Sequence, residues 1–459
     1  MGKRPRFGHS MILALMLSAP VAGCGSGNSP SPPPATATAS SAASQGLVLE
    51  AAAVSATKVG ISWTDPDASG AGYRIYRDGG LIDTVHDDSG AAQDTGLTPG
   101  SRYCYRVTAL DAAGAGIADS NQSCTTTASL ADWDIQQISA TPPVSLALDM
   151  QDRDRVSFCG SNGVYFQAEQ EDGSISTTWL DPAAACFDAL LVVGDDGSDH
   201  IVYADTNSDQ LKYATDVSGV WVVSVIPGAD GAEFPSLALD HSDAVHVAYL
   251  VFTGQSPDAY QLFYTSDASG SWQTSLVESA LAYPSIAVDA AGVPHIAYLG
   301  TARPDGSYPV RYRSPALIGW SDRTVATSED PKTLVALVMT PAGQAGIVYK
   351  SQSEIEYVTE VSGRWVATQV DSFDAAGPDD GQYGAYDVSI DLDMAGSPHI
   401  AYEDTDGDLK YAHLGSDGWD TVYVDTEGAQ NQIRMDTAGH ARIAYAGVDN
   451  LYSKLAVSP

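Results

Sequence analysis

The sequence predicts an all-β protein with two folded parts, a small β-sandwich over residues 47–127 and a seven-bladed β-propeller over residues 131–459. Three observations predict this. Short alternating strands broken by turn residues fill the first part. A four-strand unit of about 47 residues then repeats to the end of the chain. The strand that the last unit lacks stands just before the first unit, which predicts a closed ring.

Length and charge set the broad class. The 459 residues are enough for two or three domains. The chain has 22 Lys and Arg against 58 Asp and Glu, a formal net charge of −36. Such a chain repels phosphate backbones, so we expect no nucleic-acid partner. We expect a monomer.

The N-terminus carries the features of an export signal. A basic start at residues 3–6 precedes an apolar run at residues 11–22, too short to span a bilayer as a mature helix. The run ends in Val-Ala-Gly-Cys, which resembles the bacterial lipobox. The resemblance implies that residues 1–23 are a lipoprotein signal peptide and that Cys24 is acylated and anchors the chain to the membrane. An ordinary signal peptide cleaved near Ala22 is the alternative.

The segment after this cysteine predicts location and tethering. Gly25 stands where an inner-membrane retention signal would have Asp, which points to the outer membrane, surface-exposed or periplasmic. Residues 24–46 are mostly Ser, Pro, Ala, Thr and Gly and are unable to form a core, so we expect a disordered linker.

Residues 47–127 read as short strands separated by turns. Residues 59–63 and 73–77 alternate, and an Asp-Gly-Gly turn follows the second run. The segment resembles the fibronectin type III domain, in which Trp63 matches the core tryptophan. The tyrosine corner of that family matches Leu97, Pro99 and Tyr103. The resemblance implies a β-sandwich that serves as a spacer or adhesion module.

Four cysteines remain in the exported part, and an even number in an oxidising compartment predicts disulfides. Alternation directs Tyr103 and Tyr105 inward and Cys104 outward, within reach of the next strand. We expect the pairs Cys104–Cys124 and Cys159–Cys186.

The repeats begin after residue 131. In each unit an apolar strand ends in Asp, a Gly-containing turn follows, and a second strand ends in an aromatic residue. A third strand carries Leu-x-Tyr or a variant, and Gly-x-Trp leads into the fourth. Repeats of this Pro-His-Ile-Ala-Tyr type resemble those of the BNR/sialidase-like superfamily of propellers. The second-strand aromatics number seven: Phe158, Tyr203, Tyr249, Tyr298, Tyr349, Tyr402 and Tyr445.

The chain ends predict how the ring closes. The seventh unit stops at Pro459 after its third strand, without a fourth strand or a tryptophan. Residues 131–138 resemble residues 363–370, the fourth-strand segment of another unit. We therefore expect the first segment to complete the last blade and remove its exposed edge.

Ligand-binding residues are expected on the longest loops, because propellers commonly bind ligands where second-to-third and between-blade loops meet. Aromatic rings stack on apolar faces and carboxylates accept hydroxyl bonds, which suits sugar or peptide recognition. The alternative is that these loops are polar surface insertions. The candidates are Asp258, Tyr260, Arg303, Asp305, Tyr308, Asp379, Asp380, Tyr383 and Tyr386.

Metal sites have weaker support. Histidines recur three places before the second-strand aromatic, but other units carry Arg155, Gly346 or Arg442 there, so we expect packing and not a metal ring. Two acidic turns resemble calcium loops, although Asp also suits turns. Calcium at these turns is the one cofactor considered, with ligands Asp404, Asp406, Asp408, Asp205 and Asp209.

Catalysis is not favoured. The place of the sialidase Ser-x-Asp-x-Gly-x-x-Trp box reads Ser-Asp-Ala-Ser-Gly-Ser-Trp at residues 266–272, which has the wrong spacing. That family also clasps a carboxylate with three arginines, whereas Arg303, Arg311, Arg313 and Arg323 fall in one blade. The sequence favours a non-catalytic cell-surface binding or scaffold lipoprotein whose propeller recognises a glycan or a protein, such as an envelope protein. The alternatives are an extracellular glycan-active hydrolase or lyase and a purely structural envelope component.

Overall fold

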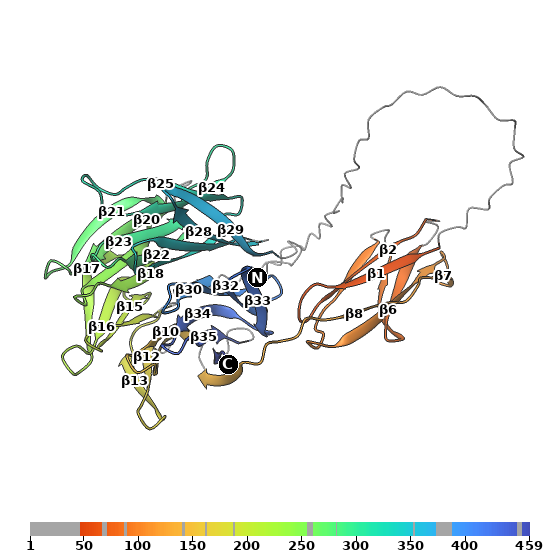
Figure 1. Cartoon of the computed structure of the whole chain (residues 1–459), viewed down its shortest axis with the longest axis horizontal. Helices are drawn as coiled ribbons and strands as arrows, with labels where there is room; N and C mark the ends of the chain where they lie inside the picture. The colour runs from red at the N-terminus through yellow and green to blue at the C-terminus, as the bar shows by residue number, and fades with distance from the viewer. Residues whose placement is uncertain are drawn as a thin grey trace, which may run out of the picture. The chain divides into compact units, whose positions relative to one another are not determined.

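The computed structural model describes residues 46–66, 71–86, 90–139, 143–160, 163–186, 189–254, 260–280, 282–351, 354–372, 388–447 and 452–459. These residues form strands and turns and no helix, which confirms the predicted all-β class. The chain divides into two compact units, one holding most residues up to Thr127 and the other running from Ala128 to Pro459 (Figure 1). Among the described residues, none belongs to a helix long and apolar enough to cross a bilayer.

The N-terminal unit is built from two antiparallel sheets. One has the strand order β1-β2-β5 and the other β4-β3-β6-β7, with β8 also paired to β6. The strands are β1 (Val48–Ala53), β2 (Val59–Thr64), β3 (Gly72–Arg77), β4 (Gly80–Val85), β5 (Ala91–Asp94), β6 (Arg102–Leu110), β7 (Gly116–Asp119) and β8 (Ser123–Thr126).

The core of this unit lies between its two sheets. Trp63 is buried with its ring centroid 5.2 Å from that of Tyr73. Of the tyrosines expected to point inward, Tyr105 is fully buried, whereas Tyr103 is half-buried at the edge of the same cluster. The Tyr105 hydroxyl donates to Asp94 at 2.9 Å, so the buried phenol has an acceptor.

In the described part of the C-terminal unit, seven four-stranded antiparallel sheets follow one another (Figure 1). The first comprises β10 (Pro143–Leu148), β11 (Asp154–Gly160), β12 (Gly163–Glu169) and β13 (Ile175–Asp181). The second comprises β14 (Ala189–Val193), β15 (Asp199–Asp205), β16 (Gln210–Thr215) and β17 (Val222–Asp230). The third comprises β18 (Ala232–Leu239), β19 (Val245–Phe252), β20 (Tyr260–Ser266) and β21 (Gln273–Ala280). The fourth comprises β22 (Ala282–Val288), β23 (Pro294–Leu299), β24 (Tyr308–Arg313) and β25 (Arg323–Ser328).

The last three sheets keep the same order. The fifth comprises β26 (Leu334–Met339), β27 (Ala345–Lys350), β28 (Glu354–Val361) and β29 (Arg364–Ser372). The sixth comprises β30 (Val388–Leu392), β31 (Pro398–Glu403), β32 (Leu409–Gly415) and β33 (Gly418–Asp425). The seventh comprises β34 (Ala429–Met435), β35 (Ala441–Ala446), β36 (Ser453–Val457) and β9 (Asp134–Ser139).

The strand β9 joins the seventh sheet although it precedes the first sheet in the chain. It pairs antiparallel with β36, with Ile135 opposite Ala456. The seventh sheet also contacts the first, since Gln432 accepts a hydrogen bond from Ser145 at 2.9 Å and Arg442 pairs with Asp154 at 3.1 Å. The two ends of this unit are therefore held together by backbone and side-chain bonds.

The recurring His, Tyr and Trp positions form one packing motif. In the fourth sheet, His295 holds Asp289 (3.2 Å) with one ring nitrogen and Tyr312 (2.6 Å) with the other. Trp365 of the next sheet packs on Tyr312 at 5.1 Å. The same His–Tyr hydrogen bond joins His200 to Tyr213, His246 to Tyr264 and His399 to Tyr411. The histidines thus hold the turn and the neighbouring sheet together, as the packing interpretation expected.

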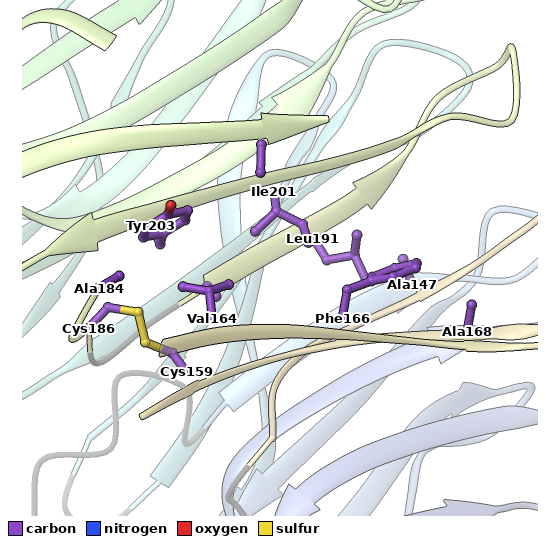
Figure 2. Close-up of a cluster of buried hydrophobic side chains, with 12 residues drawn as sticks. Ala147, Cys159, Val164, Phe166, Ala168, Ala184, Cys186, Leu191, Ile201 and Tyr203 are labelled. Atoms are coloured by element: carbon purple, nitrogen blue, oxygen red, sulfur yellow. A yellow bond between two sulfur atoms is a disulfide. The ribbon is translucent and has the colours of Figure 1, made fainter. Parts of the chain in front are cut away.

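Both predicted disulfides are present. Cys104 on β6 pairs with Cys124 on β8, and Cys159 on β11 pairs with Cys186 in the segment before β14. The second bridge lies beside Val164 and Tyr203 in a cluster that fills the space between the first two sheets (Figure 2). Two disulfides indicate an extracellular or periplasmic environment.

Candidate functional site

The first strands of the seven sheets line a common cavity of about 150 Å³. Residues of β10, β14, β18, β22, β26, β30 and β34 all contribute to its wall, and neighbouring first strands contact one another. At roughly 10–15 Å³ for each water, the cavity has room for about ten water molecules or one small ligand. All seven sheets of this unit therefore contribute residues to the lining of one cavity.

Serines fix the wall of this cavity. At one recurring position in the first strand, the serine hydroxyl accepts a hydrogen bond from a backbone N–H group of the next first strand. These bonds satisfy N–H groups that no ladder partner reaches and hold the strands at fixed spacing. The pairs are Ser145 with Leu191 (2.9 Å), Ser236 with Ile286 (3.0 Å), Ser285 with Leu337 (3.0 Å) and Ser389 with Ile433 (3.1 Å).

Four aromatic side chains, which we call the aromatic mouth, gather where the third and fourth sheets begin: Phe234, Phe252, Tyr260 and Tyr283. Phe234 is central, with ring centroids 4.5 Å from Tyr283 and 6.2 Å from Tyr260. Phe252 lies 5.2 Å from Tyr260 and is 55% exposed. Phe234 and Tyr283 also line the cavity, so the mouth is one of its boundaries.

The backbone at Phe234 is unusual. Its φ angle is +50°, in the left-handed region that bulky residues avoid, and the register of β18 against β19 shifts between Glu233 and Ser236. The bulge turns the Phe234 ring toward Tyr283 and the cavity. Strained conformations of this kind are typical of functional sites, where the surrounding structure holds them in place.

Polar groups stand beside these rings. The Tyr260 hydroxyl donates to a Glu233 carboxylate oxygen at 3.4 Å. Burial and the adjacent Glu233 raise the pKa of Tyr260, so its hydroxyl stays a neutral donor at physiological pH. The mouth therefore offers ring faces, one carboxylate and one phenol hydroxyl together, a set that can stack on a sugar and bond its hydroxyls.

Only part of the predicted ligand set lies at this place. Tyr260 belongs to the mouth, whereas Arg303 donates to Thr324 (3.2 Å) and Thr327 (3.3 Å) on β25. Asp305 accepts from the backbone N–H (3.0 Å) and hydroxyl (2.7 Å) of Ser307 inside its own turn. Tyr308 starts β24 and packs on the cluster between the fourth and fifth sheets. Outside the described residues lie Asp258, Asp379, Asp380, Tyr383, Tyr386 and Cys24.

Two of the arginines of the fourth sheet are paired internally. Arg311 contacts Glu278 at 3.3 Å and Asp322 at 3.0 Å. Arg313 is buried, pairs with Glu278 and donates to the Tyr298 hydroxyl at 3.0 Å. Their guanidinium groups bind protein carboxylates, which leaves them ill placed to clasp the carboxylate of a ligand.

Related ion-pair clusters recur where other sheets meet. Lys212 contacts Asp181 at 2.8 Å and Asp205 at 2.9 Å. Lys410 pairs with Asp371, and Lys454 pairs with Asp425 (2.6 Å) and Glu427 (2.7 Å). In each cluster a second-strand tyrosine donates to the aspartate: Tyr203, Tyr402 and Tyr445. These acids and bases neutralise one another between sheets.

Two of the turn aspartates proposed to bind calcium, Asp404 and Asp205, use their carboxylates within their own surroundings. An Asp404 oxygen accepts the backbone N–H groups of Asp406 (2.9 Å) and Asp408 (3.1 Å). Burial would raise the pKa of Asp205, but Lys212 and Ser208 outweigh it and lower that pKa to about 2.

Asp209 has a φ of +57°, a turn conformation. Within the described ranges, no three or more His, Cys, Asp and Glu side chains are arranged to hold a metal ion. Calcium binding at these turns stays a prediction.

Comparisons with known proteins identify one part of the chain. Residues 45–126 match the fibronectin type III domain family. The N-terminal unit is therefore a fibronectin type III domain. No curated protein matches the chain.

Comparison with solved structures finds a likeness to AofleA from Arthrobotrys oligospora, at 14% identity and a TM-score of 0.44 over 65% of this chain and 91% of that one. The six-bladed β-propeller lectin of Aleuria aurantia gives 11% identity and 0.44 over 62% and 96%. The Hadza microbial sialidase Hz136 gives 12% and 0.41 over 90% and 94%.

Sequence reasoning missed Phe234, Tyr283 and Glu233 because it looked for ligands in long loops. A signal was available: the sequence Phe-Pro-Ser at residues 234–236 recurs as Tyr-Pro-Ser at residues 283–285. A proline inside an apolar strand marks a bulge or an edge. In both places the register shifts at that point, which brings the aromatic residue to the cavity.

Proposed function

We propose that this protein is a non-catalytic cell-surface lipoprotein that binds a glycan. Its C-terminal unit is a closed seven-bladed β-propeller, and the glycan binds at the aromatic mouth. Cys24 would carry the lipid anchor in the outer membrane. Residues 24–46 and the fibronectin type III domain would hold the propeller away from the bilayer. Four-stranded sheets with contacting first strands, and the pairing of β9 with β36, support the propeller.

The observation that carries the binding site is the strained aromatic Phe234. A left-handed backbone at a phenylalanine is costly, and here it directs a ring into a cavity wall beside Tyr283. Packing alone would be served by the apolar residues found at the same place in other first strands, such as Leu334. Stacking of the Phe234 ring on a ligand would explain why this residue keeps a left-handed backbone.

The charges support binding over turnover. Catalysis by paired carboxylates needs acids that face the substrate with separated pKa values. Within the described part of the cavity wall, no Asp or Glu is present. The acids between sheets are bonded to Lys212, Lys410, Lys454 and their tyrosines, which suits a rigid scaffold.

The test is a glycan array probed with the full chain and with the variants Phe234→Ala and Tyr283→Ala. We expect saturable binding by the wild type and a loss of roughly two- to tenfold in affinity for each variant, since stacking on an aromatic ring contributes about 0.5–1.5 kcal/mol. Incubation with each bound glycan, followed by chromatography, should show no product.

The matched control is Trp179→Ala. Trp179 is an aromatic residue on β13 that is 55% exposed and stacks on Tyr165 away from the cavity wall. Binding that survives the changes at Phe234 and Tyr283 but is lost with Trp179→Ala would move the site to the outer strand and refute the proposal. Release of a product sugar would refute the non-catalytic role.

A further inference from the structure

A single guanidinium stands in the wall of the cavity. Among the described residues that line it, Arg434 on β34 is the only one with a charged side chain. Arg434 also borders a second space bounded by Ala147, Leu148, Val192 and Val193, on the first strands of two other sheets. Arg434 therefore borders two neighbouring spaces on the inner side of the first strands.

The repeat does not require a charge at this position. Arg434 lies opposite Arg442, in the register position that faces the His of the packing motif in other sheets. The equivalent first-strand residues are apolar in five sheets: Ala147, Val192, Ala238, Ala287 and Val338. Packing is satisfied by small or branched apolar side chains there, so the guanidinium has another role.

In the sixth sheet the equivalent first-strand residue is not apolar: it is Asp391, which lies opposite His399. One carboxylate oxygen of Asp391 accepts the backbone N–H of Met435 at 2.8 Å. Among the described residues no ion pair joins Asp391 to Arg434, although the two groups interact electrostatically. A guanidinium N–H of Arg434 donates instead to the carbonyl of Ile433 at 2.7 Å. The arginine thus has donors left for another acceptor.

We propose that Arg434 binds an oxyanion, the carboxylate or sulfate group of an acidic sugar whose ring is held at the aromatic mouth. This rests on the proposed function and names its ligand class. The surface of a chain with net charge −36 repels anions, so a cation inside the cavity selects the ligand that brings a negative group to that point. Serines also line the wall of this cavity.

Asp391 supplies the second half of the argument. Burial raises the pKa of Asp391, and the nearby Arg434 opposes that rise. A carboxylate beside the guanidinium competes electrostatically with any incoming anion and weakens its binding. At a pH above this raised pKa Asp391 is ionised, so removing its charge should strengthen the binding of an anion, whereas removing the charge of Arg434 should abolish it. A merely structural pair would give loss of stability in both variants and no such opposite signs.

The experiment is calorimetric titration of the full chain with glucuronate, glucose 6-sulfate and glucose. We expect one or both anions to bind at least tenfold more tightly than glucose, the scale of a charge-assisted hydrogen bond of about 1.5–3 kcal/mol. Arg434→Gln should remove that difference and Asp391→Asn should increase it severalfold. The matched control is Arg323→Gln, an arginine on β25 whose side chain is 55% exposed, which should change neither affinity.

The outcomes separate this inference from the proposed function. Preference for glucuronate alone or for the sulfate alone supports the inference and identifies the group. Equal affinities for all three sugars, or an anion preference that persists in Arg434→Gln, would overturn it. Absence of binding by all three also overturns it, while array binding lost in Phe234→Ala would keep the proposed function. If Arg434→Gln does not fold, Asp391→Asn decides alone, and unchanged or weaker anion binding in it counts against the inference.

Discussion

The backbone of Phe234 makes a prediction about stability that is independent of any ligand. With a φ of +50°, this residue occupies a region in which an L-amino acid costs about 1–2 kcal/mol more than glycine. We compare Phe234→Gly with Phe234→Ala, because both variants remove the ring and they differ only in the β-carbon. The difference between them isolates the backbone from the loss of packing.

The magnitude follows from two opposing terms. Glycine relieves about 1–2 kcal/mol of strain in the folded state, and its greater freedom in the unfolded chain costs about 0.5–1 kcal/mol. Phe234→Gly should therefore be more stable than Phe234→Ala by roughly 0.5–1 kcal/mol. For a unit of this size the difference shifts the melting temperature by about 2 °C.

The assay is differential scanning calorimetry of the full chain, following the transition of the C-terminal unit. Tyr283 provides the control, since it precedes a Pro-Ser pair as Phe234 does but lacks a positive φ. At Tyr283 the difference in stability between the Gly and Ala variants should have the opposite sign. Tyr283→Gly should be less stable than Tyr283→Ala by about 0.5–1 kcal/mol. Greater stability of Phe234→Ala over Phe234→Gly would refute the assignment of strain. Equal behaviour at both sites would do the same.

Three further predictions concern charge and disulfides. Burial and the nearby Asp216 raise the pKa of Asp199 to about 7, so the stability it contributes is complete below about pH 4 and is lost as the pH rises through 7. Asp199→Asn should thus raise the melting temperature at pH 8 and leave it unchanged at pH 4; an equal effect at both values contradicts this. Lys212→Met leaves the carboxylates of Asp181 and Asp205 without their cation and should lower the free energy of unfolding by about 3 kcal/mol. An unchanged denaturation midpoint would show that these ion pairs do not contribute to stability. Replacing Cys104 and Cys124 by serine opens a loop with a sequence separation of 20 and should cost about 3 kcal/mol, confined to the calorimetric transition of the N-terminal unit.

The all-β class could be predicted because its signals repeat. A tryptophan that begins the fourth strand of one sheet packs on a third-strand tyrosine of the preceding sheet. Trp133 does so on Tyr411 at 5.2 Å although it precedes the first sheet. The sequence position of this tryptophan therefore predicts that its strand pairs with β36. The disulfide Cys104–Cys124 followed from the alternation of β6 in the same way.

The aromatic mouth could not be predicted by that route. From the sequence, ligand-binding residues are expected on the long loops, because these loops vary in length and carry polar residues. Tyr260 was among those loop candidates, but Phe234 and Tyr283 come from the first strands of their sheets, at points where a register shift changes which face a side chain occupies. Alternation alone assigns Phe234 and Tyr283 to ordinary strand positions. Only the geometry of several converging first strands shows that they share a cavity with Arg434.

In a repeated fold, the departures from the repeat carry the functional information. Positions that recur in several sheets, such as that of His295, contact their turns and the neighbouring tyrosines through both ring nitrogens, which leaves the ring engaged in packing and not in binding a ligand. Phe234 departs by its backbone and Arg434 by its charge, and each departure costs stability that an apolar residue in an ordinary conformation would not. Two costly departures on the wall of one cavity are hard to explain by packing. Binding of a ligand that stacks on one and pairs with the other accounts for both.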